Sequence, residues 1–168
     1  MSGGRQDGTV VCPGSYDPVT NGHLDIITRT SAVFERVVVG VVDNPIRKQK
    51  TLFTAEERRA FIEEATASLD NVEVQIFSNL LVEFAHELEA TAILKGLRAI
   101  SDFEYEFEMA QLNRKLDPSI ESIYMIASPQ YSFLSSTGVK EMATFKGDVS
   151  DLVPASVAAA MADRLGER

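Results

Sequence analysis

The sequence predicts an α/β protein with a doubly wound, five-stranded parallel sheet, and three observations support this fold class. Short apolar runs with strand character occur at five places along the chain. Segments with helical periodicity separate them, and strands that alternate with helices indicate a parallel sheet covered on both faces. The 168 residues show no repeat, linker or break in composition. We therefore expect one domain over residues 1–168, because domains cluster near about 100–150 residues.

The first two strands are short and rich in valine. Residues 10–12 form a β-branched run that ends in cysteine, and residues 37–42 are five valines and one glycine. A continuous run of this kind is typical of a strand buried on both faces. Between the two strands we predict a helix, because Leu24, Ile27 and Phe34 fall on one helical face.

The next three elements follow from capping and periodicity. Thr54 and Glu57 have the spacing of a capping box, which predicts a helix to about residue 67. Residues 72–76 alternate between apolar and polar, as in a strand at an edge of the sheet. Residues 81–88 carry apolar side chains at helical spacing, and His86 lies off that stripe, so we expect it to face solvent.

The second half of the chain continues the alternation. Residues 92–94 and 123–127 are the predicted fourth and fifth strands. Between them, residues 103–108 alternate like a strand, whereas the apolar residues from Met109 to Leu116 recur at helical spacing; we predict a helix. A hydroxyl-rich segment opens a further helix after the fifth strand, and Pro154 has the position of a helix-opening proline for the last one.

Composition excludes several classes of protein. Sixteen Lys and Arg stand against 25 Asp and Glu, a net charge of −9, which disfavours binding to a nucleic-acid backbone. No run approaches the ~18 apolar residues of a membrane span, and one cysteine excludes an internal disulfide. The polar N-terminus has no apolar signal-peptide core, so we expect a cytoplasmic protein.

We expect the ligand-binding residues directly after the strands, because doubly wound sheets bind ligands at the carboxyl ends of their strands. After the first strand, residues 13–18 form a turn rich in Gly and Pro, and residues 20–23 open the first helix. Free backbone amides and a helix N-terminus make a phosphate cradle, although a plain turn is the alternative. His23 in that first helical turn is placed to donate to transferring phosphoryl oxygens; the alternative is a capping or surface histidine.

Cations and hydroxyl groups follow three other strands. Lys95 and Arg98 bracket a glycine after the fourth strand, and they would face His23 if the first and fourth strands are neighbours. The densest basic cluster, Arg47, Lys48 and Lys50, follows the second strand. Residues 128–138 carry several Ser and Thr hydroxyl groups where a helix begins. They indicate either a second phosphate site or more helix-capping hydroxyl groups than the helix needs. Solvated surface cations are the alternative reading of both basic groups. No zinc-ligand cluster and no Gly-x-Ser-x-Gly elbow is present in the sequence.

Taken in order, these motifs resemble the bacterial phosphopantetheine adenylyltransferases, a family of the nucleotidylyltransferase superfamily. The turn at residues 13–18 with residues 20–23 is the part that the superfamily shares, and it indicates only the reaction type. The motifs specific to this family are residues 95–106 and 131–137. The resemblance as a whole extends from about Val10 to the last helix. It implies a Rossmann-like nucleotidylyltransferase fold and a helical segment at residues 103–116.

The resemblance also implies a reaction and its partners. The protein would join ATP and 4′-phosphopantetheine to give dephospho-CoA and pyrophosphate, with Mg²⁺, as a homohexamer subject to feedback by CoA. It implies that His23, Ser15 and Ser136 are catalytic. The residues implied to contact ATP are Ser15, Tyr16, His23, Gly96, Leu97, Arg98, Glu106, Tyr131, Ser132, Phe133, Leu134, Ser135, Ser136 and Thr137. The residues implied to bind the acceptor are Ser15, Arg47, Leu81 and Lys95.

Three positions depart from the common pattern of the family. Ser15 stands where many members have threonine, and Lys95 stands where some have arginine, which keeps a charge but loses a bidentate grip. The basic loop is two residues longer than usual, so its acceptor-binding cation is Arg47, Lys48 or Lys50; we choose Arg47. The alternatives to the whole reading are a related nucleotidylyltransferase with a different phosphate acceptor, and a non-catalytic nucleotide sensor.

Overall fold

The computed structural model describes residues 5–46 and 50–166, which form one parallel sheet wrapped by helices. The strand order is β3-β2-β1-β4-β5, and all four neighbouring pairs are parallel. The strands are β1 (Gln6–Gly14), β2 (Phe34–Val42), β3 (Val72–Phe77), β4 (Ala90–Leu97) and β5 (Glu121–Ile126). The α/β doubly wound, Rossmann-like fold class is confirmed, including the edge position of β3 and the contact between β1 and β4.

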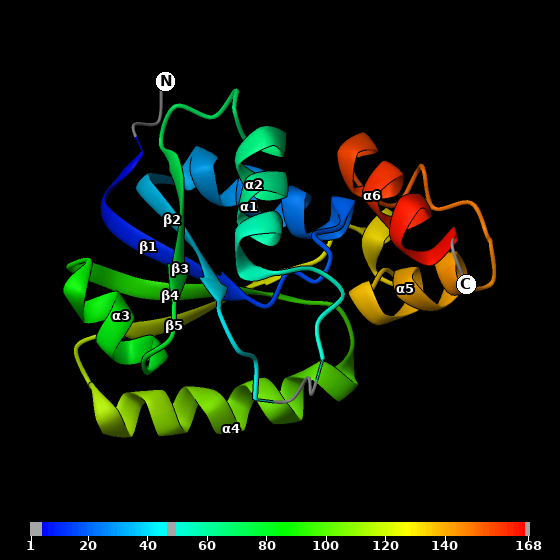
Figure 1. The fold of residues 1–168 in the computed structure, drawn as a ribbon. Coiled ribbons are helices and arrows are strands. Elements are labelled where there is room, and N and C mark those ends of the chain that lie inside the picture. The colour runs from blue at the N-terminus through cyan, green and yellow to red at the C-terminus, as the bar shows by residue number, and fades with distance from the viewer. Residues whose placement is uncertain (1–4, 47–49, 167–168) are drawn as a thin grey trace.

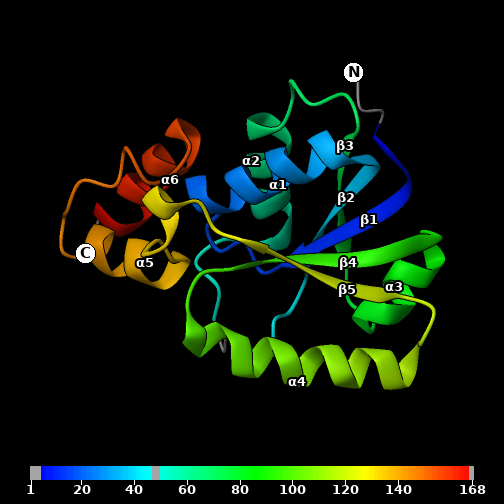
Figure 2. The ribbon, with the colours of Figure 1, turned by 180° about the vertical axis from the view of Figure 1, so that it is seen from behind.

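Helices cover both faces of this sheet (Figure 1). They are α1 (Asn21–Val33), α2 (Ala55–Ala65), α3 (Leu81–Glu87), α4 (Ile100–Leu116), α5 (Ser136–Thr144) and α6 (Ala155–Gly166), with a 3-10 turn at Pro129–Tyr131. Figure 1 shows α1 and α2 on one face and α3 and α4 on the other, while α5 and α6 lie together beyond one end of the sheet. The reverse view shows the chain running from β5 directly into that end (Figure 2). None of the helices in the described parts of the chain has the length and apolarity to cross a membrane.

Two hydrophobic layers sandwich the central strands. On one face, Val39 and Val41 pack with Ile27 of α1 and Ile62 of α2. On the other, Val38 packs with the side chains of α3. This two-sided burial is the reason why β2 is a nearly continuous valine run. Its single glycine, Gly40, is required by a close approach, because a Cβ atom there would lie 2.8 Å from a ring carbon of Phe84.

The structure tests the predicted helix at residues 103–116 and the predicted end of the first helix. The segment from residue 103 to residue 116 is helical, as predicted, and the rings of Phe103 and Phe107 stack one turn apart at 5.9 Å. The assignment of Phe34 to the first helix is wrong. Its amide closes the last turn on Thr30, but its φ and ψ of −104° and 149° are extended, so it begins β2.

Candidate active site

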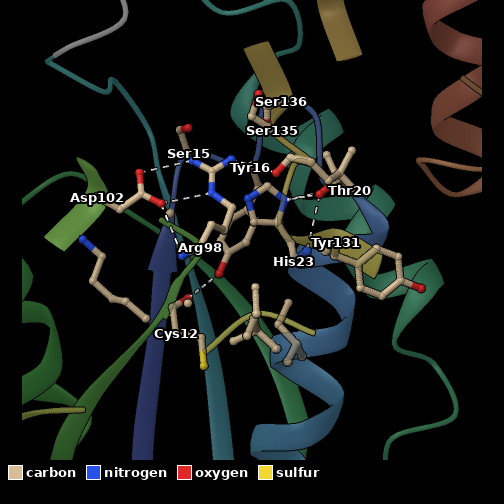
Figure 3. Close-up of a pocket in the computed structure, with 18 of the residues that line it drawn as sticks. Cys12, Ser15, Tyr16, Thr20, His23, Arg98, Asp102, Tyr131, Ser135 and Ser136 are labelled. Atoms are coloured by element: carbon tan, nitrogen blue, oxygen red, sulfur yellow. Dashed lines mark hydrogen bonds and ion pairs between the residues drawn. The ribbon is translucent and has the colours of Figure 1, made fainter. Parts of the chain in front are cut away.

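A cavity of about 360 Å³ opens at the carboxyl ends of β1 and β4, where the strand order reverses. Four segments line it: the turn between β1 and α1, the end of β4, the first turns of α4, and the segment that opens α5 (Figure 3). These are four of the segments that the sequence singled out. Parallel strands end at one edge of the sheet, and the adjacency of β1 and β4 brings their following residues together.

The turn after β1 is held by a buried tyrosine. Tyr16 has a φ of 48°, and its hydroxyl donates to the carbonyl oxygen of Cys12 at 2.9 Å. Burial raises the pKa of the Tyr16 hydroxyl well above its usual range, so it stays protonated. Burial also raises the pKa of the Cys12 thiol to about 12, which excludes a thiolate nucleophile at neutral pH. Tyr16 therefore shapes the cavity wall, and Cys12 forms part of its floor.

His23 both caps α1 and lines the cavity. The Thr20 hydroxyl accepts from the His23 amide at 3.4 Å, and the Thr20 amide donates to Nδ1 of the His23 ring at 3.0 Å. A neutral imidazole whose Nδ1 accepts a hydrogen bond carries its proton on Nε2. The ring also meets Tyr16 edge to face, with centroids 5.0 Å apart. The cap therefore fixes both the orientation of the ring and the nitrogen that can donate.

The two cations at the end of β4 line the same cavity, and each is paired with a carboxylate of α4. Lys95 is still part of the strand, which extends beyond the predicted residue 94 to Leu97, and Arg98 directly follows it. Lys95 Nζ lies 2.7 Å from Glu106 Oε2. Arg98 Nε lies 3.3 Å from Asp102 Oδ2, and Arg98 Nη1 donates to the Leu134 carbonyl at 2.7 Å. These contacts hold both side chains against the cavity wall. The positive charge of the site is therefore partly compensated by Glu106 and Asp102.

The start of α5 forms the opposite wall. The Ser135 hydroxyl caps the helix by accepting from the Gly138 amide at 3.0 Å. The Ser136 hydroxyl donates to the Pro18 carbonyl at 2.8 Å, which ties this wall to the turn after β1. The hydroxyl groups are thus caps and tethers. The cap occupies the Gly138 amide, which leaves the amides of Ser136 and Thr137 as the anion donors of the first helical turn. A catalytic role for Ser136 stays a prediction.

The structure places most, but not all, of the predicted residues at this cavity. The predicted residues that line it are Ser15, Tyr16, His23, Lys95, Gly96, Arg98, Glu106, Tyr131, Leu134, Ser135, Ser136 and Thr137. Four others are outside the lining: Leu81, the first residue of α3, packs against the core, Leu97 lines a groove along α4, and Ser132 and Phe133 are exposed. Arg47 and Lys48 lie outside the described residues, and Lys50 is exposed. The predicted contacts of all these residues with ligands stay predictions.

Three polar residues that matter to the site were missed by the sequence reasoning. Asp102 belongs to a recognised motif but had no role, and it is the partner of Arg98. Asp17 is fully buried, and its only sequence signal is its place in the turn after β1. Arg58 is also buried and donates to the Ser15 carbonyl at 2.6 Å. No sequence signal could have found Arg58, because it stands among the ordinary charges of an amphipathic helix. His86 does face solvent, beside Asp117 at 3.3 Å.

The described residues supply no obvious ligand set for a metal ion. Within residues 5–46 and 50–166, no group of three or more His, Cys, Asp or Glu is arranged to hold one. The two carboxylates at the cavity, Asp102 and Glu106, already face Arg98 and Lys95.

A doubly wound parallel sheet with a Gly- and Pro-rich turn, a helix N-terminus and paired cations at its switch point defines an α/β protein of the nucleotide-binding class. Comparison with known proteins makes this specific. The family model described as cytidylyltransferase-like matches residues 11–142. The phosphopantetheine adenylyltransferase of Alkaliphilus metalliredigens is 51% identical over 154 residues, which cover 92% of this chain and 97% of the relative. That of Clostridium tetani is 54% identical over 144 residues, or 86% and 89% of the two chains. The chain belongs to the cytidylyltransferase-like family and, within it, to the phosphopantetheine adenylyltransferases.

Proposed function

We propose that this protein transfers the adenylyl group of ATP to 4′-phosphopantetheine, giving dephospho-CoA and pyrophosphate in coenzyme A biosynthesis. The observation that carries the proposal is the 51% identity to a phosphopantetheine adenylyltransferase over 92% of the chain. The cavity supports it, because His23, Lys95 and Arg98 come from two separate segments and line one site. A nucleotide sensor without catalysis would have no need of a donor fixed in this orientation.

The reaction needs positioning and charge stabilisation more than covalent chemistry. A phosphate oxygen of the acceptor attacks the α-phosphorus of ATP, a new P–O bond forms, and the bond to the bridging oxygen of pyrophosphate breaks in line. The acceptor phosphate is already anionic at neutral pH, so no strong general base is required. His23, with its proton on Nε2, donates to the charge that develops on the transferring group. The amides of Gly22 in α1 and of Ser136 and Thr137 in α5, whose residues line the cavity, would add further donors.

The two cations divide the anionic ligands between them. Lys95, near the end of β4, serves the acceptor phosphate, while Arg98, directly after the strand, serves the phosphates of ATP. Their pairing with Glu106 and Asp102 supports this division, because each cation is held in a separate place along α4. Binding of a phosphate would replace part of each ion pair with a stronger, bidentate or doubly charged partner.

Further parts of the proposal concern the cofactor and the assembly. Mg²⁺ would be held mainly by phosphate oxygens and water, and the roles of His23, Lys95 and Arg98 do not depend on it.

A cytoplasmic homohexamer is proposed from the family resemblance. Exposed apolar side chains along α4 and at the end of β5 support self-association: Ile100, Phe103, Phe107, Leu112, Leu116 and Ile126. Native mass spectrometry would measure the number of copies. Feedback by CoA would appear as inhibition that competes with 4′-phosphopantetheine.

The deciding experiment is pyrophosphate release by the purified protein with ATP and 4′-phosphopantetheine. We expect release with this pair, and little with CTP or with nicotinamide mononucleotide, sugar phosphates or polyol phosphates as acceptors. Preference for another acceptor would indicate a related nucleotidylyltransferase. ATP binding without pyrophosphate release from any pair would indicate a sensor. The His23→Ala variant serves as the control for contaminating activity.

A further inference from the structure

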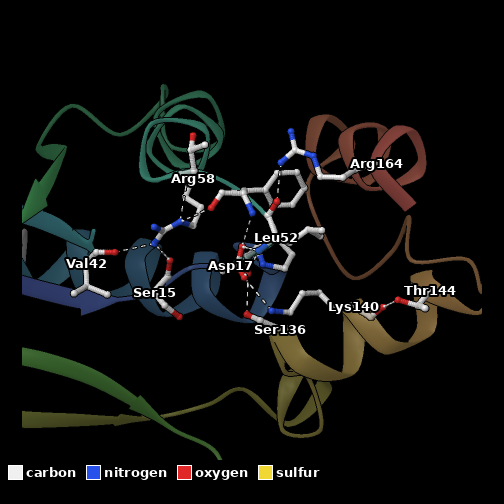
Figure 4. A network of polar contacts seen from close by, with 12 residues as sticks. Ser15, Asp17, Val42, Leu52, Arg58, Ser136, Lys140, Thr144 and Arg164 are labelled. Carbon is white, nitrogen blue, oxygen red and sulfur yellow. Dashed lines mark hydrogen bonds and ion pairs between the residues drawn. The ribbon is translucent and has the colours of Figure 1, made fainter. Parts of the chain in front are cut away.

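A fully buried carboxylate, Asp17, lies just behind the cavity and joins three segments of the chain (Figure 4). Its Oδ1 accepts from the amides of Leu52 and Phe53, both at 3.0 Å. Its Oδ2 lies 2.9 Å from Nζ of Lys140 on α5. The segment before α2, the turn after β1 and the helix α5 therefore meet at one side chain.

Two of these segments are the walls of the cavity. Tyr16, the residue before Asp17, lines the cavity from the turn after β1. Ser136, one helical turn before Lys140, lines it from α5 and donates to the Pro18 carbonyl at 2.8 Å. The two walls are thus tied together twice, once by this hydrogen bond and once by the ion pair between Asp17 and Lys140. Neither member of the ion pair lines the cavity itself.

Arg58 of α2 also holds the turn after β1, through carbonyl groups at the end of β2 and in the turn itself. Its Nη1 donates to the carbonyls of Ser15 at 2.6 Å and of Val42 at 2.9 Å, and its Nη2 donates to that of Asp43 at 2.9 Å. Burial lowers the pKa of the Arg58 guanidinium, and the nearby charge of Asp17 opposes that effect. The turn after β1 is therefore anchored to the end of β2, which leaves α5 as the wall whose place depends on Asp17.

The carboxylate of this ion pair is fully buried, and the Lys140 side chain is 25% exposed. An ion pair that is shielded from water in this way is a poor way to gain stability. Desolvation of two charges offsets most of their attraction, and apolar replacements of similar size are often neutral or stabilising. The same pair is effective at fixing one arrangement, because a misplaced partner would leave a charge buried alone. In this protein the arrangement that it fixes is the separation of the two cavity walls.

We propose that Asp17 and Lys140 are a positioning pair that sets the N-terminal turn of α5 against the turn after β1, and thereby places the groups that face the nucleotide. The nucleotide is taken from the proposed function, and the inference rests on it to that extent. Lys95 stands on β4, outside this network, so the pair acts on the nucleotide side of the cavity and leaves the acceptor side in place.

The test compares Asp17→Asn, Lys140→Met and the double variant. The asparagine keeps one oxygen for the Leu52 and Phe53 amides, but it turns a donor toward Lys140 and loses the second contact of the Leu52 amide, at 2.9 Å. We expect each single variant to lose stability to urea, and the double variant to regain part of it because no unpaired charge stays buried. We expect kcat of the double variant to stay reduced by about tenfold to a hundredfold, since displacement of reacting groups by about 1 Å costs up to about 10²-fold. KM for ATP should rise, and KM for 4′-phosphopantetheine should stay within about twofold.

Two comparisons make the result decisive. Lys140→Arg keeps the charge opposite Asp17, so its kcat and its KM for ATP should stay close to the wild-type values. Replacing the exposed ion pair of Arg59 and Glu63, 2.7 Å apart on α2, with methionine and glutamine should leave both constants unchanged. The inference is overturned if the double variant has wild-type constants, or if kcat recovers together with stability. If the wild-type protein releases no pyrophosphate, the proposed function fails, and calorimetry of ATP binding still tests the pair: weakened binding by the double variant supports it, and unchanged binding overturns it.

Discussion

Nζ of Lys95 lies 2.7 Å from Oε2 of Glu106, and the pair joins the end of β4 to the cavity face of α4. Both side chains are mostly shielded from water, with exposed fractions of 25% and 13%. The family resemblance assigns the two residues to different ligands. The carboxylate nevertheless cancels part of the positive charge that an anion would meet on entering this side of the cavity.

Replacement of Glu106 by glutamine should therefore strengthen the binding of simple anions. We expect the Kd for inorganic pyrophosphate, measured by calorimetry, to fall about two- to fivefold, which corresponds to up to about 1 kcal/mol for a partly exposed pair. Glu108→Gln, on an exposed position of the same helix, is the matched control and should leave Kd unchanged. Equal Kd values for the two variants would show that Glu106 does not control the charge of the site.

His23→Ala should lower turnover far more than it weakens ATP binding. Its ring is held with the proton on Nε2, and a donor aimed at charge that develops only in the transition state acts on kcat. Removal of one such donor typically costs about 10²–10³ in rate. Pre-steady-state kinetics with calorimetry of ATP binding would separate the two effects.

The same substitution also removes a helix cap, so it needs a control. Thr20→Ala removes the N-cap hydroxyl and leaves the imidazole, and it should lower stability by about 0.5–2 kcal/mol. The hydroxyl and the amide of Thr20 both lie 3.0 Å from Nδ1 of His23. We expect the variant's loss of kcat to be less than about tenfold, because the amide remains. If Thr20→Ala were as slow as His23→Ala, the cap rather than the imidazole would account for the effect.

Lys95 and Arg98 should act on different substrates, although three positions separate them. Lys95→Ala should raise KM for 4′-phosphopantetheine more than KM for ATP, and Arg98→Ala should do the reverse. Their partners on α4 are one turn apart, which keeps the two charges in separate places. Steady-state kinetics with each substrate varied in turn would measure the split. If both variants weaken the same substrate equally, the two cations form one general electrostatic patch.

Arg164 of α6 should contribute a pH-dependent part of the stability. Its hydrogen bonds to Glu57 at the start of α2 lower the pKa of that carboxyl to about 2, from an ordinary 4.5. A depressed pKa gives stability that is present above about pH 4.5 and is lost as the pH falls through about 2. Because the pair is largely exposed, we expect Arg164→Met to cost only about 1 kcal/mol at pH 7.

Urea unfolding at several pH values would test this. The difference in unfolding free energy between wild type and Arg164→Met should be constant above pH 4.5 and should shrink toward pH 2. Arg59→Met removes an exposed pair within α2 and should cost less than about 0.5 kcal/mol. A difference that does not change with pH would mean that Arg164 acts through its other contacts, the hydrogen bond to the Leu52 carbonyl at 2.7 Å and the Phe53 ring 4.8 Å away, and not through Glu57.

The amino-acid sequence by itself determined the fold class, the order of the elements and the turn that opens α1. These depend on local periodicity, on capping residues and on Gly and Pro, all of which act over a few positions. Even there, the boundary at Phe34 was misplaced, because an apolar residue at the junction fits both a helical face and the start of a buried strand. Most of the cavity residues could be named for the same reason: they follow predicted strands.

The tertiary structure alone decided which of those residues face one another. The adjacency of β1 and β4 placed His23 with Lys95, and the packing of α4 gave Lys95 its partner Glu106. Asp17 and Lys140 are 123 positions apart in the chain, and each in isolation is an unremarkable charged residue. The role of this pair depends on the burial of Asp17 and on the short distance between its carboxylate and the Lys140 ammonium group. Both arise only when the chain packs, and no local pattern of residues encodes them.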